Sequence, residues 1–167
     1  MIKEEDALGR IKKTEWDLSL KMSETDAVGR ILSYRYNDYG ELTEVILPNR
    51  EKLQYRYNER GLLTERILAQ GERWRYEYDE RGALSKLTSP YGLVWHYQYD
   101  EKGRLIRLDY PDETYQSYEY DEHTHQLIGR RDSRGELTSF TRDLFGRMTQ
   151  LTLPDKSQYH YEYSQAH

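Results

Sequence analysis

One pattern recurs along this chain every 21 residues, and that period constrains the fold more than any other feature of the sequence. The clearest copies begin at Tyr55, Tyr76 and Tyr97, and a further copy begins at Tyr34. Each copy follows the pattern Tyr-x-Tyr-Asx-x-x-Gly-x-Leu, in which Asx is asparagine or aspartate and x is any residue. Because a repeat of this length is one supersecondary unit that buries its apolar face against its neighbours, the period predicts a stacked array.

Less regular copies extend the array at both ends. In residues 118–148, one extra residue and the absence of a glycine after Asp121 displace the next copy by one position, and we expect a bulge at that turn. Residues 1–33 are a degenerate start, with leucine in the glycine position after Asp17. The whole chain, residues 1–167, is therefore predicted to be a single domain of about seven repeats.

The asparagine or aspartate that precedes glycine by three residues predicts a tight turn. Its side-chain oxygen accepts a hydrogen bond from the backbone N–H two residues on, and glycine takes a positive φ without a Cβ clash. Together they specify a type I turn closed by a bulge, which joins two antiparallel strands. A second turn lies about halfway through each period, so each repeat should contain two strands. These mid-period turns are marked by Pro48, Gly71, Pro90, Pro111 and Pro154 and by the pairs Asp6–Gly9, Asp26–Gly29 and Asp132–Gly135.

The segments before the main turns alternate large and polar residues, which is the period of a half-exposed strand. Trp74, Tyr76 and Tyr78 are expected to share one face. Stacked repeats would then set each tyrosine pair beside the next in ladders, whose cross-strand contacts contribute about 0.2 to 1 kcal/mol each. The returning strands, such as residues 42–47, alternate less strictly, and we expect local bulges or burial on both faces there.

Two sets of residues follow as candidates for a structural role, one in the turns and one in the aromatic ladder. The turn residues are Asn37, Gly40, Asn58, Gly61, Asp79, Gly82, Asp100, Gly103, Asp143 and Gly146. The aromatic ladder consists of Tyr36, Tyr57, Tyr78, Tyr99, Tyr120, Tyr163, Trp74 and Trp95.

The turn signals divide the chain into about sixteen strands. They predict an all-β fold of tandem antiparallel β-hairpin repeats of about 21 residues. Because right-handed twist accumulates with every strand, a sheet this wide should form a long curled or spiralling structure.

The composition agrees with a thin sheet and excludes several classes of protein. Tyrosine occurs 17 times against 2 phenylalanines, and a ring with a polar tip suits packing surfaces that stay partly wet. The net charge of −5, without a basic block, argues against a nucleic-acid partner. The chain has no cysteine for a disulfide framework, no run long enough for a membrane span and no secretory signal, so its localisation stays open.

The segment Tyr76–Leu84, repeated at Tyr97–Leu105, resembles the YD or RHS repeat, and the resemblance runs from about Asp6 to Tyr163. It implies a long antiparallel sheet that spirals into a hollow shell, as in bacterial polymorphic toxins, toxin-complex C components, wall-associated proteins and teneurins. Such a shell encloses or displays a variable C-terminal segment, often a toxin. The resemblance also implies an exported or cell-surface bacterial parent.

The chain departs from that family in two respects. Self-cleaving members carry a motif with an Asp-Pro pair, which this sequence lacks, and its nearest approach, Asp132–Leu137, reads as a turn. No toxin domain follows the repeats before His167. We therefore expect an excised piece of shell or a short orphan repeat protein.

Patterns that carry catalysis or metal binding are missing from the sequence. The turn carboxylates precede glycine in a hairpin context, so they read as structural rather than as catalytic pairs. His123 and His125 would set two imidazoles on one face of a strand, but no third ligand lies at a recognisable spacing, and solvated histidines are expected. His96 and His160 occupy polar positions of the expected strands, and we expect cross-strand partners for them. We predict no catalytic residue, no metal, no cofactor and no enzyme activity.

The first hypothesis for function is a non-catalytic β-shell module, whose partner is the remainder of a larger shell or its C-terminal toxin cargo. Open sheet edges also favour self-association. The alternative is a glycan-binding or cell-contact module that uses exposed tyrosine and tryptophan rows, including Trp74 and Trp95. A self-cleaving shell is a third hypothesis, which the missing motif argues against.

Overall fold

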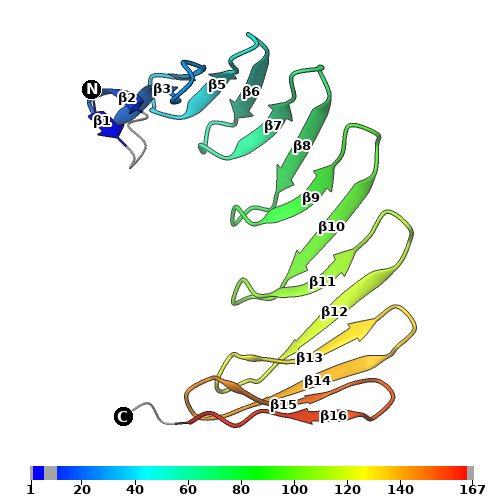
Figure 1. Cartoon of the computed structure of the whole chain (residues 1–167). Coiled ribbons are helices and arrows are strands. Elements are labelled where there is room, and N and C mark those ends of the chain that lie inside the picture. Colours follow the sequence, from blue (N-terminus) through cyan, green and yellow to red (C-terminus); the bar gives the residue numbers. More distant parts are fainter. Residues whose placement is uncertain (1, 6–10, 165–167) are drawn as a thin grey trace. The chain divides into compact units, whose positions relative to one another are not determined.

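The computed structural model describes residues 2–5 and 11–164, and all of its regular elements are β-strands (Figure 1). The turn expected at Asp6–Gly9 lies outside the described residues. The strands are β1 (Ile2–Glu5), β2 (Ile11–Asp17), β3 (Leu20–Thr25), β4 (Ile31–Tyr36), β5 (Leu42–Ile46), β6 (Lys52–Tyr57), β7 (Leu63–Ile67), β8 (Arg73–Tyr78), β9 (Leu84–Thr88), β10 (Val94–Tyr99), β11 (Leu105–Asp109), β12 (Tyr115–Tyr120), β13 (Leu127–Asp132), β14 (Leu137–Arg142), β15 (Met148–Thr152) and β16 (Gln158–His160).

Each strand is hydrogen-bonded to the strand that follows it in sequence, so the sheet order runs from β1 to β16 without a crossover. The prediction of an all-β fold of tandem antiparallel hairpins is confirmed. Strands β1 and β16 are the first and last strands of this order. The curling expected of the whole array stays a prediction. Within the described residues, no helix is long and apolar enough to cross a membrane.

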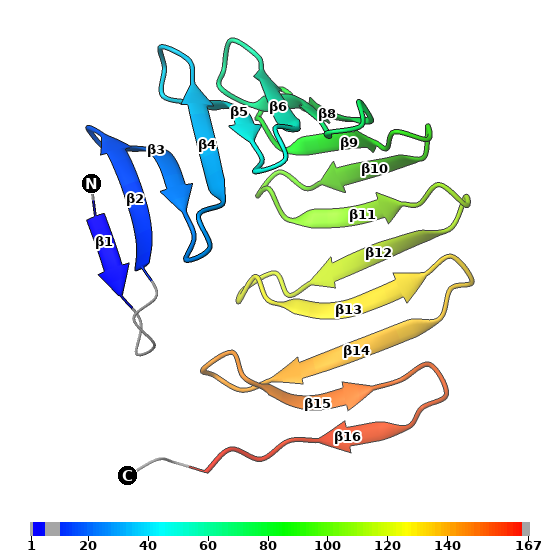
Figure 2. The ribbon, with the colours of Figure 1, turned by 45° about the horizontal axis from the view of Figure 1, so that its top comes forward.

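The strands fall into two compact units. The first comprises residues up to 77 together with 88–92, and the second comprises residues 78–87 together with those from 93 onward. Within the second unit, β10 to β16 lie side by side as successive rungs, joined alternately at their two ends by turns (Figure 2). The main turns of the repeat therefore form a row along one edge.

The sheet has little conventional core. Among the described residues, the only buried hydrophobic side chains are Val45 and Ile67, at 8% and 7% exposure. Strands β6 and β8 alternate exposed polar and half-buried large residues along their whole length. The tyrosine-bearing face is thus only partly covered, and neighbouring strands supply most of its packing.

The opposite face of the first unit carries acidic side chains between basic ones. Glu65 lies 3.1 Å from Arg56 on the strand before it and 3.4 Å from Arg73 on the strand after it. Glu44 is held in the same way by Arg35 at 3.3 Å and Lys52 at 3.2 Å. Because the cations are largely exposed, each pair contributes at most about 1 kcal/mol.

A bulge recurs one step from the main turns, on the returning strands where irregularity was expected. In the β6–β7 hairpin, Tyr57 pairs with Leu63 while Arg56 pairs with Glu65, which leaves Thr64 without a cross-strand partner in the register. The Thr64 hydroxyl donates a 3.2 Å hydrogen bond to the Arg56 carbonyl. The same register shift occurs in the hairpins β2–β3, β4–β5, β10–β11, β12–β13 and β14–β15.

The first complete hairpin differs from the expected copy. Leucine was expected in the glycine position of a four-residue turn after Asp17, but Asp17 pairs directly with Leu20. Only Leu18 and Ser19 form the turn, and Leu18 takes a positive φ of 51°. The strands extend to a two-residue turn here because Leu20 lacks the conformational freedom of the glycine that ends the longer turns.

Candidate functional site

The main turns have one shared geometry, seen clearly after β6. Gly61 N–H donates to the Asn58 carbonyl at 3.0 Å, and Gly61 takes φ +73°. The Asn58 side-chain oxygen accepts two backbone N–H groups, from Arg60 at 2.9 Å and from Leu62 at 3.0 Å. Sequence reasoning anticipated only the first of these bonds. The backbone bond from glycine to the Asx carbonyl also closes the turns Asn37–Gly40, Asp79–Gly82, Asp100–Gly103 and Asp143–Gly146.

Aspartate turns add an ion pair to this geometry. The Asp100 carboxylate accepts the backbone N–H of Arg104 at 2.9 Å through one oxygen and the Arg104 Nε–H at 2.7 Å through the other. The Arg104 backbone N–H, together with the guanidinium, holds the pKa of Asp100 below its ordinary value. Asp143 and Arg147 repeat both contacts, at 3.0 Å and 2.7 Å. These carboxylates are therefore committed to the backbone and not available as a catalytic pair.

In four copies of the motif, the second tyrosine ties its hairpin to the preceding one. Tyr57 donates its hydroxyl to the carbonyl of Leu42 at 2.8 Å, and Tyr120 does the same to Leu105, each across 15 residues of sequence. Phenylalanine cannot make this bond, which explains the preference for tyrosine at these positions. Tyr36 and Tyr163 make equivalent bonds to the carbonyls of Lys21 and Met148.

The hydroxyl reaches a carbonyl that the sheet ladder does not use. Strands β5 and β6 pair over three residues, and the last pair on this side is Glu44 with Gln54. Leu42 lies beyond that pair, so its carbonyl needs another donor. The Tyr57 hydroxyl supplies it where the strands separate. The tyrosine tie is thus the continuation of the ladder by a side chain.

The remaining ladder candidates lie on the corresponding strands of the intervening repeats. Tyr78, Tyr99, Trp74 and Trp95 are half-buried on β8 and β10. Burial raises the pKa of the Tyr99 hydroxyl, and the neighbouring Tyr97 and Asp79 act in the same direction. The Tyr99 hydroxyl therefore stays protonated and able to donate at neutral pH.

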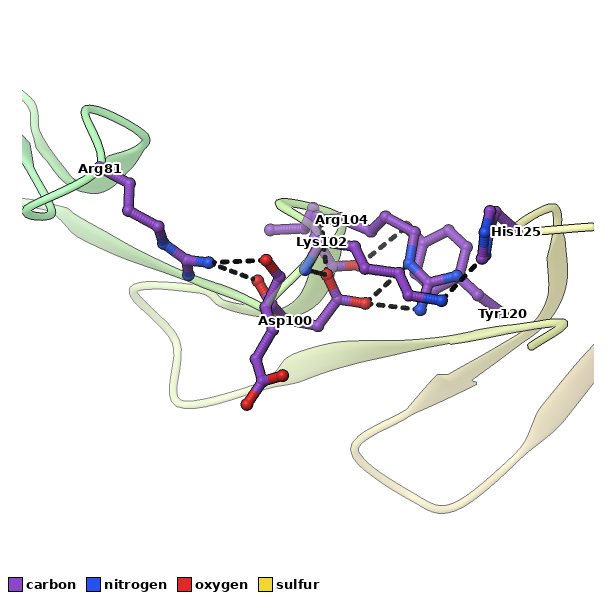
Figure 3. Close-up of polar contacts among 8 residues, drawn as sticks. Arg81, Asp100, Lys102, Arg104, Tyr120 and His125 are labelled. Atoms are coloured by element: carbon purple, nitrogen blue, oxygen red, sulfur yellow. Dashed lines mark hydrogen bonds and ion pairs between the residues drawn. The ribbon is translucent and has the colours of Figure 1, made fainter. Parts of the chain in front are cut away.

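Consecutive turns also touch through basic side chains (Figure 3). Arg81 donates to the carbonyls of Asp100 and Glu101 in the next turn, at 3.0 Å and 3.2 Å. Lys102 of that turn reaches His125 of the following one, with 3.2 Å between Nζ and Nδ1. Contacts from one turn to the next were not foreseen, because they depend on how far apart the repeats stack.

The variant repeat makes the same turn and the same bond to the preceding hairpin with other residues. Its turn is one residue longer, and His125 N–H donates to the Asp121 carbonyl at 3.0 Å. His125 replaces glycine and takes φ 60°. In the next copy Arg142 stands where tyrosine belongs, and its Nε donates to the Leu127 carbonyl at 3.3 Å across 15 residues. The tie therefore persists with a guanidinium in place of a hydroxyl.

The described histidines lie either in the turn after β12 or on strands β10 and β16. His123 and His125 lie in the longer turn after β12 with exposed side chains, which agrees with the expectation of solvated histidines and not with a pair on the face of a strand. His96 and His160 lie in β10 and β16 with exposed side chains. Within residues 2–5 and 11–164, no three His, Asp or Glu side chains form a group that could hold a metal ion.

Two family models match the sequence. The model described as the teneurin YD-shell matches residues 13–96, half of the chain, and the model described as the RHS repeat matches residues 120–158. No individual curated protein matches the sequence.

Solved structures of toxin complexes have the same fold. A Tc holotoxin pore from Photorhabdus luminescens superimposes with a TM-score of 0.68 at 17% identity, over 90% of this chain and 9% of that one. The TcdB2-TccC3 complex gives 0.68 at 18% identity, over 89% and 10% of the two chains. The same complex without its hypervariable C-terminal region gives 0.68 at 17%, over 89% and 9%. The chain thus spans about a tenth of the length of these structures, and by its hairpin repeats and its matched models it belongs to the YD-shell family of RHS repeat proteins.

Proposed function

We propose that this chain is a structural segment of a larger RHS/YD shell, whose parent encloses or displays a variable C-terminal segment. The observation that carries the proposal is the tyrosine tie, in which a side-chain hydroxyl of one hairpin binds a carbonyl of the preceding hairpin, as Tyr57 binds Leu42. A repeat held in this way depends on its neighbours rather than on a core of its own. Further repeats of this kind can be added one after another to extend the sheet of the shell.

The proposal assigns a structural role to both sets of candidate residues. The Asx and glycine residues of the turns, from Asn37 to Gly146, reverse the chain and fix the bulge. The ladder tyrosines join one hairpin to the next through their hydroxyls and rings. The shell segment is non-catalytic, since the turn carboxylates accept hydrogen bonds from backbone N–H groups and from basic side chains.

The partners follow from the size of the relatives. This chain covers about a tenth of the toxin-complex chains that share its fold, and one of those structures is described as lacking a hypervariable C-terminal region. We propose that the partners of this segment are further repeats of the same shell and the segment that the shell encloses.

Limited proteolysis of the natural gene product that contains these repeats tests the proposal. An enclosed segment should resist protease at concentrations that digest the same segment when it is expressed alone. The double variant Tyr57→Phe with Tyr120→Phe removes two ties and should make the enclosed segment cleavable, whereas Tyr39→Phe at an exposed turn tip should not. Equal digestion of the enclosed and the isolated segment would contradict the proposal.

Glycan binding is the second candidate, because a groove of about 660 Å³ beside the turns is lined by Tyr39, Tyr55 and Tyr57. Tyr39 is 90% exposed at its rim. The engagement of the Tyr57 hydroxyl by Leu42 favours the structural role for that ring. Binding on a glycan array that disappears with Trp74→Ala and Trp95→Ala would favour the second candidate, and self-cleavage of the purified protein would favour a proteolytic shell. We expect neither.

A further inference from the structure

The groove between two consecutive main turns changes character in the variant repeat. Around Asn58 the groove is lined by Thr43, Tyr55 and Glu59. The corresponding groove of the second unit, of about 320 Å³, lies between the β12–β13 and β14–β15 hairpins and has Ile128, Phe140 and Leu144 at these three positions. One repeat therefore has three apolar residues at groove positions where the first groove has threonine, tyrosine and glutamate, while other lining residues, such as Gln126 and Thr141, remain polar.

The apolar residues continue onto the tip of the turn, where the fold does not need them. Leu144 and Phe145 are 102% and 85% exposed, and Ile128 on the bulge is 39% exposed. The equivalent tip positions of the regular copies carry pairs such as Glu59 and Arg60. Contiguous exposed apolar residues mark interaction surfaces, because they cost solubility without adding to the fold.

A cation without a counter-ion lies in the same groove. Arg142 donates Nε to the Leu127 carbonyl at 3.3 Å and Nη1 to the Gly146 carbonyl at 3.1 Å. In the part of the chain that the structure describes, no carboxylate pairs with this guanidinium, which is only half-exposed. The two aspartates that line the groove are occupied, Asp121 by its own turn and Asp143 by Arg147.

We propose that this groove binds an extended peptide segment of a partner protein, with an apolar side chain next to a carboxylate. The apolar side chain lies against Ile128, Phe140 and Leu144, and Phe145 covers it from the turn tip. The carboxylate pairs with Arg142 and supplies the missing negative charge, because a charge-assisted bond is strongest where the cation is partly removed from water. A membrane surface is a poorer match, since it is recognised by clusters of basic residues and not by one.

NMR titration of the ¹⁵N-labelled full chain with capped peptides tests the proposal. The probes are a Gly-Phe-Glu-Leu-Gly peptide, its lysine counterpart Gly-Phe-Lys-Leu-Gly and the polar counterpart Gly-Ser-Glu-Ser-Gly. We expect the first to shift the amide signals of Ile128 and Phe145 and to bind at least tenfold more tightly than the other two. Equal affinity for the three peptides, shifts elsewhere, or no shift up to the solubility limit of the first peptide would overturn the proposal.

Two variants with the residues of the regular repeat keep the test independent of folding. Leu144→Glu with Phe145→Arg restores a tip like that of Glu59 and Arg60, and should abolish binding while the rest of the spectrum is unchanged. Arg142→Tyr restores the consensus tie and should reduce the glutamate peptide to the affinity of the lysine peptide. Retained tenfold preference in either variant would show that the site lies elsewhere.

Discussion

Two turns of the array, Asn37–Gly40 and Asp100–Gly103, share a backbone and differ in charge. In both, glycine N–H donates to the Asx carbonyl at 3.0 Å. In both, the Asx side-chain oxygen accepts the N–H groups two and four residues on. The residue four positions after the Asx residue differs between the turns. In the first turn it is Glu41, whose carboxylate accepts a hydrogen bond from the Asn37 amide, and in the second it is Arg104, which pairs with Asp100.

Glu41 and Arg104 make different contacts with the next hairpin. A Cβ added to Gly61 would lie 2.8 Å from Glu41 Oε1, so the carboxylate packs directly beneath that glycine. The Arg104 guanidinium instead lies over the ring of Tyr120, 4.7 Å from its centre. The Asx oxygen and glycine thus fix the backbone of both turns, while the contact between repeats can be made by a carboxylate or by a guanidinium, provided that it matches the Asx residue of its own turn.

Acid should break the aspartate turns and spare the asparagine turns, and this is the largest effect expected. The pKa values of Asp26, Asp100 and Asp132 are held below the ordinary value, first of all by the backbone N–H four residues on. A carboxylate whose pKa is lowered on folding stabilises fully above its unfolded pKa, about 3.9, and this stability is lost as the pH falls through the folded value. The thermal midpoint should therefore decrease between about pH 5 and about pH 2.

The triple variant Asp26→Asn, Asp100→Asn and Asp132→Asn is the control for this titration. Each asparagine keeps the side-chain oxygen that accepts the backbone N–H groups, as Asn37 and Asn58 do, but it does not titrate. The thermal midpoint of the variant, followed by circular dichroism, should decrease less on acidification than that of the unmodified chain. An equal decrease would mean that other carboxylates govern acid stability.

Gly61→Ala should cost more stability than Gly103→Ala, because only Gly61 has a neighbour beneath it. Both changes place alanine at a positive φ, +73° and +77°, at a cost of about 1 to 2 kcal/mol. At Gly61 the added methyl also displaces Glu41 from its bond with Asn37, a further loss of about 1 kcal/mol. Urea denaturation of the two variants measures the difference, and equal free energies of unfolding would contradict the close packing of Glu41.

The hydroxyl bonds of Tyr57 and Tyr120 should contribute about equally to the free energy of unfolding. Tyr57→Phe and Tyr120→Phe each remove a 2.8 Å bond to a leucine carbonyl and keep the ring, so each should lower the free energy of unfolding by about 1 kcal/mol. Tyr39→Phe, on a residue that is 90% exposed, should change it by less than about 0.5 kcal/mol. A loss for Tyr39→Phe as large as for the two ties would show that the hydroxyl bonds are not what the ladder depends on.

The repeat, the hairpins and the number of strands were predictable because each depends on neighbours in sequence. The Asx and glycine spacing specifies a turn locally, and the alternation around Tyr76 specifies a strand. The bond from Tyr57 to Leu42 was not predictable, since it depends on where the β5–β6 ladder ends. The role of Arg142 was hidden for the same reason, because a residue outside the consensus looks degenerate until its 15-residue partner is known.

The first hairpin shows where counting spacing fails, and it provides the smallest expected effect. The spacing from Asp17 predicted Leu20 in the glycine position. Asp17 instead pairs with Leu20, and the residue with positive φ is Leu18, two residues earlier, at 51°. Leu18 is 98% exposed, so its side chain contributes little packing to offset this strain. Leu18→Gly removes the strain at some cost in unfolded-state entropy, for a net gain of about 0.5 kcal/mol. Leu144→Gly is the matched control: an equally exposed leucine whose φ is not positive should lose stability or stay unchanged, and a gain there equal to that at Leu18 would show that backbone strain is not the cause.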